Sequence, residues 1–132
     1  VNTSVWVSYF RWGNVQLQSL LMEDVVVCHP FIIGELACGH LRNRKEILSL
    51  LQSLPSVKML DPVEVLEFIE QNHLMGVGIG FIDVNLLASA LLNRVSLWTF
   101  DKKLRQAATK LKVFYQTSLY HEHLHSCRTP RG

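Results

Sequence analysis

The sequence predicts an α/β fold, a three-layer α/β/α sandwich with a central, mostly parallel sheet. Short β-branched runs recur along the chain, helical patterns lie between them, and the connections are short. Apolar runs that are too short for helices are typical of strands buried on both faces. Alternation of such strands with helices indicates a parallel sheet that helices cover on both sides.

The individual elements follow from local signals. Strands are expected at 25–27, 57–60, 95–100 and, more weakly, 113–115. Helices are expected at 5–12, 30–41, 46–54, 62–73, 81–93 and 102–111. Ser4 is the expected cap of the first helix, Pro30 suits the first turn of the second, and Asp61 with Pro62 begins the fourth. Val1 resembles the last residue of a strand, so further residues are expected upstream of it.

Length and composition indicate one globular domain. The 132 residues are enough to bury a core, and we expect a domain at 1–119 followed by a histidine-containing tail at 120–132. Hydrophobic residues at 48% and charged residues at 18% exclude a disordered chain or a coiled coil. The formal net charge of +2 neither requires nor excludes a nucleic-acid partner.

The cysteines and the apolar runs bear on the compartment. Cys28 and Cys38 lie inside apolar runs and are expected to be small buried hydrophobic residues, which fits a reducing cytoplasm. No apolar run approaches the ~18 residues of a membrane helix, and no signal peptide is recognised. We therefore expect a cytoplasmic protein without a membrane segment.

Three acidic residues stand apart from the other carboxylates because they lie inside apolar segments. These are Glu35, Asp83 and Asp101. Each has a simple explanation alone: Asp101 as a helix N-cap, Asp83 as an anion in the first turn of a helix, and Glu35 as a surface or ion-paired residue. A carboxylate in apolar surroundings is nevertheless costly unless a cation compensates its charge.

A shared site explains the three carboxylates together. Ligands of open parallel sheets collect at the carboxyl ends of the strands, where Asp101 closes one expected strand and Asn2 closes another. Glu35 and Asp83 lie on helices that can lean over the same edge. Several oxygen ligands at one place suit Mg²⁺ or Mn²⁺.

Four stretches together resemble the PIN-domain nucleases, and within them the VapC toxins of toxin–antitoxin pairs. They are Val1-Asn2-Thr3-Ser4-Val5-Trp6, Ile33-Gly34-Glu35-Leu36, the run from Gly80 to Ala88 around Asp83, and the run from Leu97 to Leu104 around Asp101. The resemblance covers residues 1 to about 115. It implies an α/β/α fold and a metal-dependent endoribonuclease toxin that hydrolyses RNA with Mg²⁺ or Mn²⁺.

The resemblance also implies roles for individual residues. Glu35, Asp83 and Asp101 would hold the metal, Thr99 would support the last motif through its hydroxyl, and Asn2 stands where the family has its first aspartate. Because an amide is a poorer ligand for a hard cation than a carboxylate, we expect weakened or absent cleavage by the chain as written. The alternative is a catalytically dead PIN-like module that binds RNA or an antitoxin.

The partners implied are RNA, a small VapB-like antitoxin and a second copy of the chain. Lys102, Lys103 and Arg105 follow the last acidic motif and are candidates for RNA phosphates, although a solvated helix face explains them equally well. The aromatic-rich helix at 5–12 is a candidate surface for either protein partner, with ordinary core packing as the alternative.

Two further motifs suggest competing activities. The segment His121-Glu122-His123-Leu124-His125 is a literal HExxH, the zinc-peptidase pattern, but it offers no clear third ligand, so a solvated tail or adventitious zinc binding is favoured. The glycine-rich run at 76–80 lacks the lysine of a phosphate-binding loop and is expected to be a turn before the Asp83 helix. His29, His40 and His73 are expected to be cap or surface residues.

Overall fold

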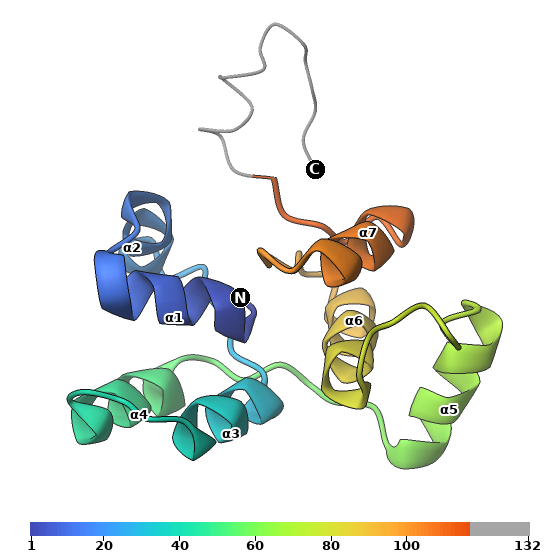
Figure 1. The fold of residues 1–132 in the computed structure, drawn as a ribbon, viewed down its shortest axis with the longest axis horizontal. Helices are drawn as coiled ribbons and strands as arrows, with labels where there is room; N and C mark the ends of the chain where they lie inside the picture. Colours follow the sequence, from blue (N-terminus) through green and yellow to red (C-terminus); the bar gives the residue numbers. More distant parts are fainter. Residues whose placement is uncertain (117–132) are drawn as a thin grey trace, which may run out of the picture.

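Seven helices make up most of the ordered structure, a computed structural model that describes residues 1–116. They are α1 (Thr3–Trp12), α2 (Val15–Met22), α3 (Pro30–Cys38), α4 (Arg44–Ser53), α5 (Pro62–Gln71), α6 (Phe81–Asn93) and α7 (Lys102–Lys110). Figure 1 shows α1 to α4 gathered at one end of the molecule and α5 to α7 at the other, with the N-terminus between them. Within the described residues, no helix is long and apolar enough to cross a membrane.

Side-chain caps explain where several helices begin. Asp61 and Glu64 form a capping box at the start of α5, and α6 has the expected bounds. The expected cap of α1 was wrong: Asn2 is the N-cap, because its side-chain oxygen accepts the N–H of Ser4.

Other helix bounds differ from those expected. Helix α3 ends at Cys38 and not at residue 41, because Gly39 is its C-cap. The sequence analysis also missed α2, whose N-cap is Asn14. Its apolar residues Leu17, Leu20 and Leu21 have helical spacing, and this was the signal available.

None of the four expected strands is formed among residues 1–116, where these segments pair only through isolated parallel bridges. One joins Cys28 to Ser56, and the other joins Leu97 to Phe114. The N–H of Asn2 also donates to the carbonyl of Trp98 at 2.8 Å. Helices begin within three residues of several of these segments, which leaves little length for pairing. The central sheet of the expected sandwich is therefore not established by this pairing.

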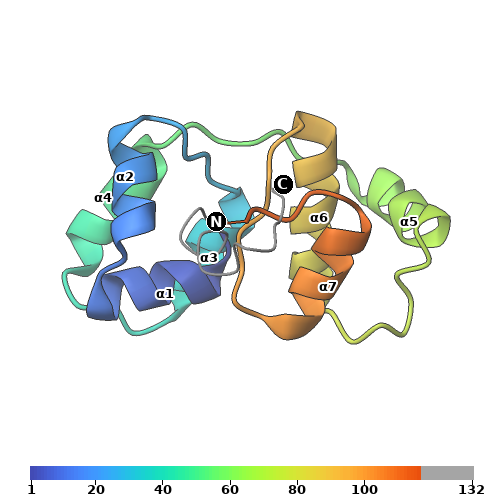
Figure 2. The same ribbon diagram turned by 90° about the horizontal axis from the view of Figure 1, so that it is seen from above.

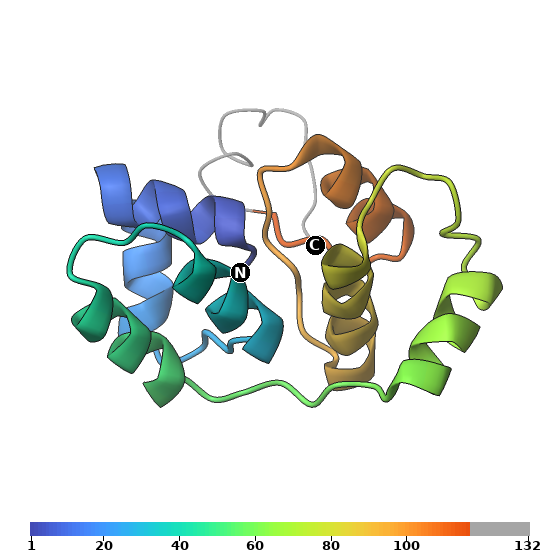
Figure 3. The ribbon, with the colours of Figure 1, turned by 60° about the horizontal axis from the view of Figure 1, so that its bottom comes forward.

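The core lies between the two groups of helices. Helix α6 contributes most to it, because every residue from Val84 to Ala90 is buried. Figures 2 and 3 show α6 between α5 and the extended segment that leads into α7. The exposed α6 residues Leu91 and Leu92 lie at its C-terminal end. Cys28 is buried as expected, whereas Cys38 is exposed and the prediction for it was wrong.

The aromatic-rich α1 is mainly a core helix. Val5 and Trp6 have no exposed surface, and the Trp6 ring stacks on Phe10 with ring centres 5.6 Å apart. Trp12 is the exception, with 80% of its surface exposed. Core packing, the alternative explanation for this helix, accounts for Val5 and Trp6, whereas Val7, Tyr9 and Phe10 are only partly buried.

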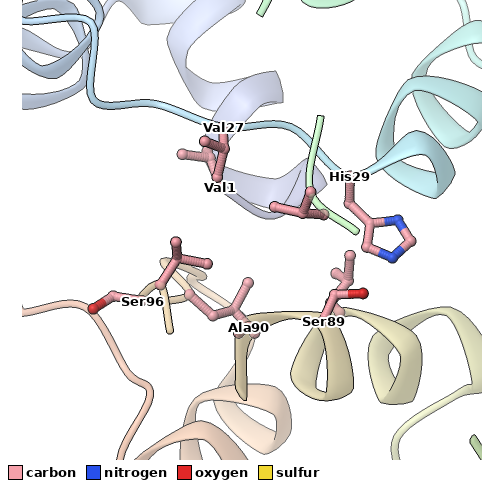
Figure 4. A pocket seen from close by; sticks show the side chains of 10 residues that line it. Val1, Val27, His29, Ser89, Ala90 and Ser96 are labelled. Carbon is pink, nitrogen blue, oxygen red and sulfur yellow. The ribbon is translucent and has the colours of Figure 1, made fainter. Parts of the chain in front are cut away.

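A small cavity of about 30 Å³ lies where the two groups of helices meet (Figure 4). Val1, Val27 and His29 lie on one side of it, and Ser89 and Ala90 of α6 lie on the other. His29 is the N-cap of α3, since its Nδ1 accepts the N–H of Phe31 at 3.0 Å. Its Nε2 is buried and has no hydrogen-bond partner among residues 1–116. Burial, and secondarily the positive N-terminus, lowers the pKa of His29 to about 4.

Candidate active site

Asn2 is fixed by three hydrogen bonds to one atom. Its Oδ1 accepts the Ser4 N–H at 3.0 Å, the Ser4 hydroxyl at 2.7 Å and the Thr99 hydroxyl at 3.0 Å. Asn2 is buried, with 6% of its surface exposed. The side chain of Asn2 is thus held in place at the start of α1.

Thr99 and Asp101 connect this position to the start of α7. Thr99 is buried, and its hydroxyl accepts the N–H of Asp101 at 3.0 Å. Asp101 caps α7 through Oδ2, which accepts the Leu104 N–H at 2.9 Å. The expected cap role is therefore correct, and it leaves Oδ1 of Asp101 without a protein donor among residues 1–116.

Glu35 approaches the same region from the middle of α3. The hydroxyl of Thr3 donates to Glu35 Oε1 at 2.6 Å, which links α1 and α3 at the edge of the site. Glu35 is half-buried. Thr3 was not among the expected site residues, although it lies next to Asn2 in the motif from which the resemblance was drawn.

Asp83 completes the group from the first turn of α6. Burial is the largest cause that raises the pKa of Asp83, followed by the negative charges of Asp101 and Glu35. Asp101 and Glu35 therefore lie near enough to Asp83 for their charges to act on it, although the three carboxylates come from three different helices or caps. We call Glu35, Asp83, Asp101 and Asn2 the acidic pocket.

The donor set of the acidic pocket fits a hard divalent cation. All its charged groups are carboxylates, and their mutual repulsion is what a bound cation relieves. Over the described part of the chain, no three acidic, histidine or cysteine side chains already lie close enough together to hold a metal ion. The residue types fit a cation, and the side chains stand further apart than in a closed metal site.

The expected RNA-binding residues lie on α7, beside the acidic pocket. Lys102, Lys103 and Arg105 are exposed. The Lys103 side chain runs over Gly78, where an added Cβ would lie 2.7 Å from Nζ. Arg105 stacks on the Phe114 ring, with its guanidinium carbon 5.8 Å from the ring centre. Two of the three cations are thus held by contacts with the protein.

A groove of about 900 Å³ leads away from the acidic pocket between α1, α3 and α4. It begins at Thr3 and Glu35, and Arg11 and Arg42 lie along it. Its apolar lining comprises Val7, Phe10, Leu36, Leu41 and Ile47. We call it the α1–α4 groove; the sequence analysis did not predict it, because its walls come from elements that no local pattern relates.

The remaining motifs lie elsewhere. The glycine-rich run forms a turn before α6, with positive φ at Gly76 and Gly78, as expected. His29 is a helix cap, and His40 and His73 are exposed, also as expected. The HExxH segment lies outside the described residues.

A family model for the PIN domain matches residues 1–110. The chain belongs to the PIN-domain family. This PIN domain is 40% identical to Ribonuclease VapC32 of Mycobacterium tuberculosis strain CDC 1551 / Oshkosh over 114 residues, which are 86% of this chain and 92% of that protein. The identity and coverage are the same for Ribonuclease VapC32 of strain ATCC 25618 / H37Rv. Family membership implies an α/β fold, in agreement with the expected fold class.

Proposed function

We propose that this PIN domain is an endoribonuclease toxin of the VapC type, paired with an antitoxin. The observation that carries the proposal is the proximity of Asp101 and Glu35 to Asp83: burial, and then the charges of these two carboxylates, raise the pKa of the Asp83 carboxyl. The similarity to proteins named ribonuclease supports RNA as the substrate.

A divalent cation, Mg²⁺ or Mn²⁺, is the cofactor in this proposal. Glu35, Asp83 and Asp101 would hold it, directly or through water. When bound, such an ion lowers the pKa of a water molecule and offsets the charge that grows on the phosphate oxygens.

The residues around the carboxylates orient them. Thr3 holds one oxygen of Glu35, and the Leu104 N–H holds one oxygen of Asp101, so that each carboxylate keeps its second oxygen for the pocket. Thr99 supports the last motif through its hydroxyl, which receives the Asp101 N–H. Such fixed donors reduce the reorganisation that the site must undergo when it binds a substrate.

Asn2 weakens or abolishes this activity in the chain as written. The pocket has one negative charge fewer than it would have with aspartate, so it attracts a cation less strongly. The second candidate function, a catalytically dead PIN-like module that binds RNA or an antitoxin, rests on this one residue.

RNA phosphates would be met by Lys102, Lys103 and Arg105 at the start of α7. All three are exposed beside the capping residue Asp101 of the acidic pocket. Positive side chains at the edge of an acidic pocket offset the repulsion between its carboxylates and the RNA backbone.

The α1–α4 groove is the proposed docking site of the VapB-like antitoxin. Its apolar lining suits one face of an amphipathic segment, and it leads directly to Glu35. A basic side chain of the antitoxin would then reach the acidic pocket.

A homodimer is proposed through an apolar surface on α5 and α6. Val63 and Leu66 of α5 are 65% and 62% exposed, and the exposed residues Met59, Leu91 and Leu92 line a hollow together with Glu64 and Phe68 of α5. Clustered exposed apolar side chains of this kind mark protein interfaces.

Three further features belong to the proposal. The two parallel bridges and the Asn2–Trp98 hydrogen bond support a central, mostly parallel sheet in a three-layer sandwich. The domain would span 1–119, with 120–132 as a tail. Cytoplasmic localisation is supported by the free thiols of Cys28 and Cys38.

Mn²⁺-dependent cleavage of a bulk transfer-RNA pool tests the function. The assay compares the unaltered chain, Asn2→Asp, and the double variant Asn2→Asp, Asp83→Asn. We expect strong cleavage by Asn2→Asp alone. No cleavage by any of the three, with the fold intact and metal bound, would rule out general ribonuclease activity and favour the binding module.

A further inference from the structure

The orientation of the Asn2 carboxamide follows from its neighbours. The hydroxyl of Ser4 accepts the N–H of Phe100 at 3.0 Å, and the hydroxyl of Thr99 accepts the N–H of Asp101 at 3.0 Å. Each hydroxyl is therefore free to donate its own hydrogen, and each lies within hydrogen-bond distance of Asn2 Oδ1, closer than the 3.4 Å that separates the two hydroxyl oxygens. The Ser4 backbone N–H, which can only donate, makes the third bond to the same atom.

The nitrogen of Asn2 consequently faces away from these three donors. Turning the amide round would set its NH₂ group against the Ser4 backbone N–H, which can only donate, and would leave that N–H unsatisfied. Nδ2 has no partner among residues 1–116, yet it is not one of the buried unpartnered atoms, so it remains reachable from solvent. The oxygen that would ligate a cation is therefore occupied, and the accessible atom is a donor.

A donor at this place suits a different ligand from the one the carboxylates attract. A cation is repelled by the positive end of an N–H dipole, whereas a phosphate oxygen accepts a hydrogen bond from it. Among residues 1–116, the pocket oxygens that accept no hydrogen bond from the protein belong to Glu35, Asp83 and Asp101. Their negative charges repel phosphate. Asn2 can offset part of that repulsion in the absence of metal.

We propose that Asn2 Nδ2 donates a hydrogen bond to a phosphate oxygen of RNA, and that Asn2 is not a cation ligand in this chain. The pocket as written then binds an RNA strand without a divalent cation, through a contact that an aspartate at the same position abolishes. This inference rests on the proposed function, since it takes RNA to be the ligand of the acidic pocket.

Two variants separate the possible roles of Asn2. Asn2→Ser keeps an oxygen that can cap α1 but has no NH₂ group, and Asn2→Asp replaces the nitrogen by a charged oxygen at nearly constant shape. Affinity for Mn²⁺ is measured by calorimetry, and affinity for a short single-stranded RNA is measured in EDTA.

The three proteins should rank differently in their affinity for Mn²⁺ and in their affinity for RNA. The unaltered chain and Asn2→Ser should bind Mn²⁺ equally, and Asn2→Asp should bind it at least about 10-fold more tightly. In EDTA the unaltered chain should bind RNA about 5- to 10-fold more tightly than Asn2→Ser, with Asn2→Asp the weakest.

Distinct results would overturn the inference and the proposed function. Weaker Mn²⁺ binding by folded Asn2→Ser than by the unaltered chain would make Asn2 a ligand, and equal RNA affinities would exclude the phosphate contact. RNA binding by none of the three proteins, with no cleavage by Asn2→Asp, would overturn the proposed function as well.

A second measurement uses the unaltered protein alone. The side-chain NH₂ signals of Asn2 in an ¹⁵N-labelled sample should shift when the RNA is added in EDTA. Signals that stay in place while backbone amides of α7 shift would show that RNA binds without the Asn2 contact, and would contradict the inference.

Discussion

At the scale of single residues, the Ser4 and Thr99 hydroxyls decide the geometry of the acidic pocket. Each receives a hydrogen bond from the backbone of the segment leading into α7 and passes one to Asn2. The start of α1 and the start of α7 are therefore joined through side chains, in addition to the backbone bond between Asn2 and Trp98.

The sequence identified three candidate acidic residues but not the side chains that hold them. Glu35, Asp83 and Asp101 were recognisable because each interrupts an apolar segment. The hydrogen bond of Thr3 to Glu35 spans 32 positions of sequence, and the bond of Thr99 to Asn2 spans 97. No local pattern encodes contacts between residues so far apart, so these supporting residues emerge only from the folded chain.

His29 should make stability depend on pH. Its folded pKa of about 4 lies below the ordinary value of 6.5, so between these pH values the unfolded chain binds more protons. The contribution of His29 to the free energy of unfolding is therefore present above pH 6.5 and is lost as the pH falls toward 4. Between pH 7 and 4.5 this amounts to about 2 kcal/mol.

Urea unfolding of His29→Asn at the two pH values checks this expectation. Asparagine keeps a cap for α3 but does not titrate, so the variant should lose about 2 kcal/mol less than the unaltered protein on acidification. His40→Asn, at an exposed histidine, should behave like the unaltered protein. An unchanged pH dependence in His29→Asn would show that His29 is not the titrating group.

At the scale of elements, the side chain of Asn93 ties the end of α6 to the segment at 57–60. Its Oδ1 accepts the Lys58 N–H at 3.1 Å, and its Nδ2 donates to the Lys58 carbonyl at 2.8 Å and to the Ser89 carbonyl at 2.7 Å. One amide thus pairs with both backbone groups of Lys58, as a neighbouring strand would do.

Replacement of Asn93 by alanine should loosen this connection. The loss of three hydrogen bonds, two of them to exposed backbone groups, should reduce the free energy of unfolding by about 1–2 kcal/mol. Asn72→Ala, which removes a single side-chain bond to the Phe68 carbonyl, is the matched control and should cost less. If urea denaturation gave Asn72→Ala the larger effect, the proposed role of Asn93 in joining the two elements would be wrong.

Sequence patterns located most helices because capping chemistry is local. Asp61, Pro62 and Glu64 identify the start of α5, and Gly80 with the Asp83 segment identifies α6. Helix α2 was not predicted, since it follows α1 after only two residues, Gly13 and Asn14, and the boundary between the two helices is short. The partners of the short extended segments depend on long-range packing and were beyond local patterns.

At the scale of the whole molecule, two groups of helices share a core along the extended segments. The exposed apolar residues Val63, Leu66, Leu91 and Leu92 belong to α5 and α6, whereas the α1–α4 groove is lined by residues between Thr3 and Ile47. Separate surfaces allow a second copy and an antitoxin to bind at the same time.

Leu66→Glu should therefore convert a dimer into a monomer. A charged side chain inside the proposed apolar interface is left without a partner. The substitution should therefore raise the dissociation constant of the dimer by at least about 100-fold. Light scattering after size-exclusion chromatography measures the mass. Val15→Glu, at an exposed residue of α2, should leave the mass unchanged. A monomeric unaltered chain at high concentration would exclude the dimer itself.

The position of the α1–α4 groove along the chain has a consequence during synthesis. All the residues that line it lie between Thr3 and Ile47, whereas the acidic pocket also needs Asp83 and Asp101. Ribosomes add about 5–20 residues per second, so the last carboxylate is made seconds after the groove is complete. An antitoxin that docks in this groove can meet the nascent chain before the pocket it must block exists.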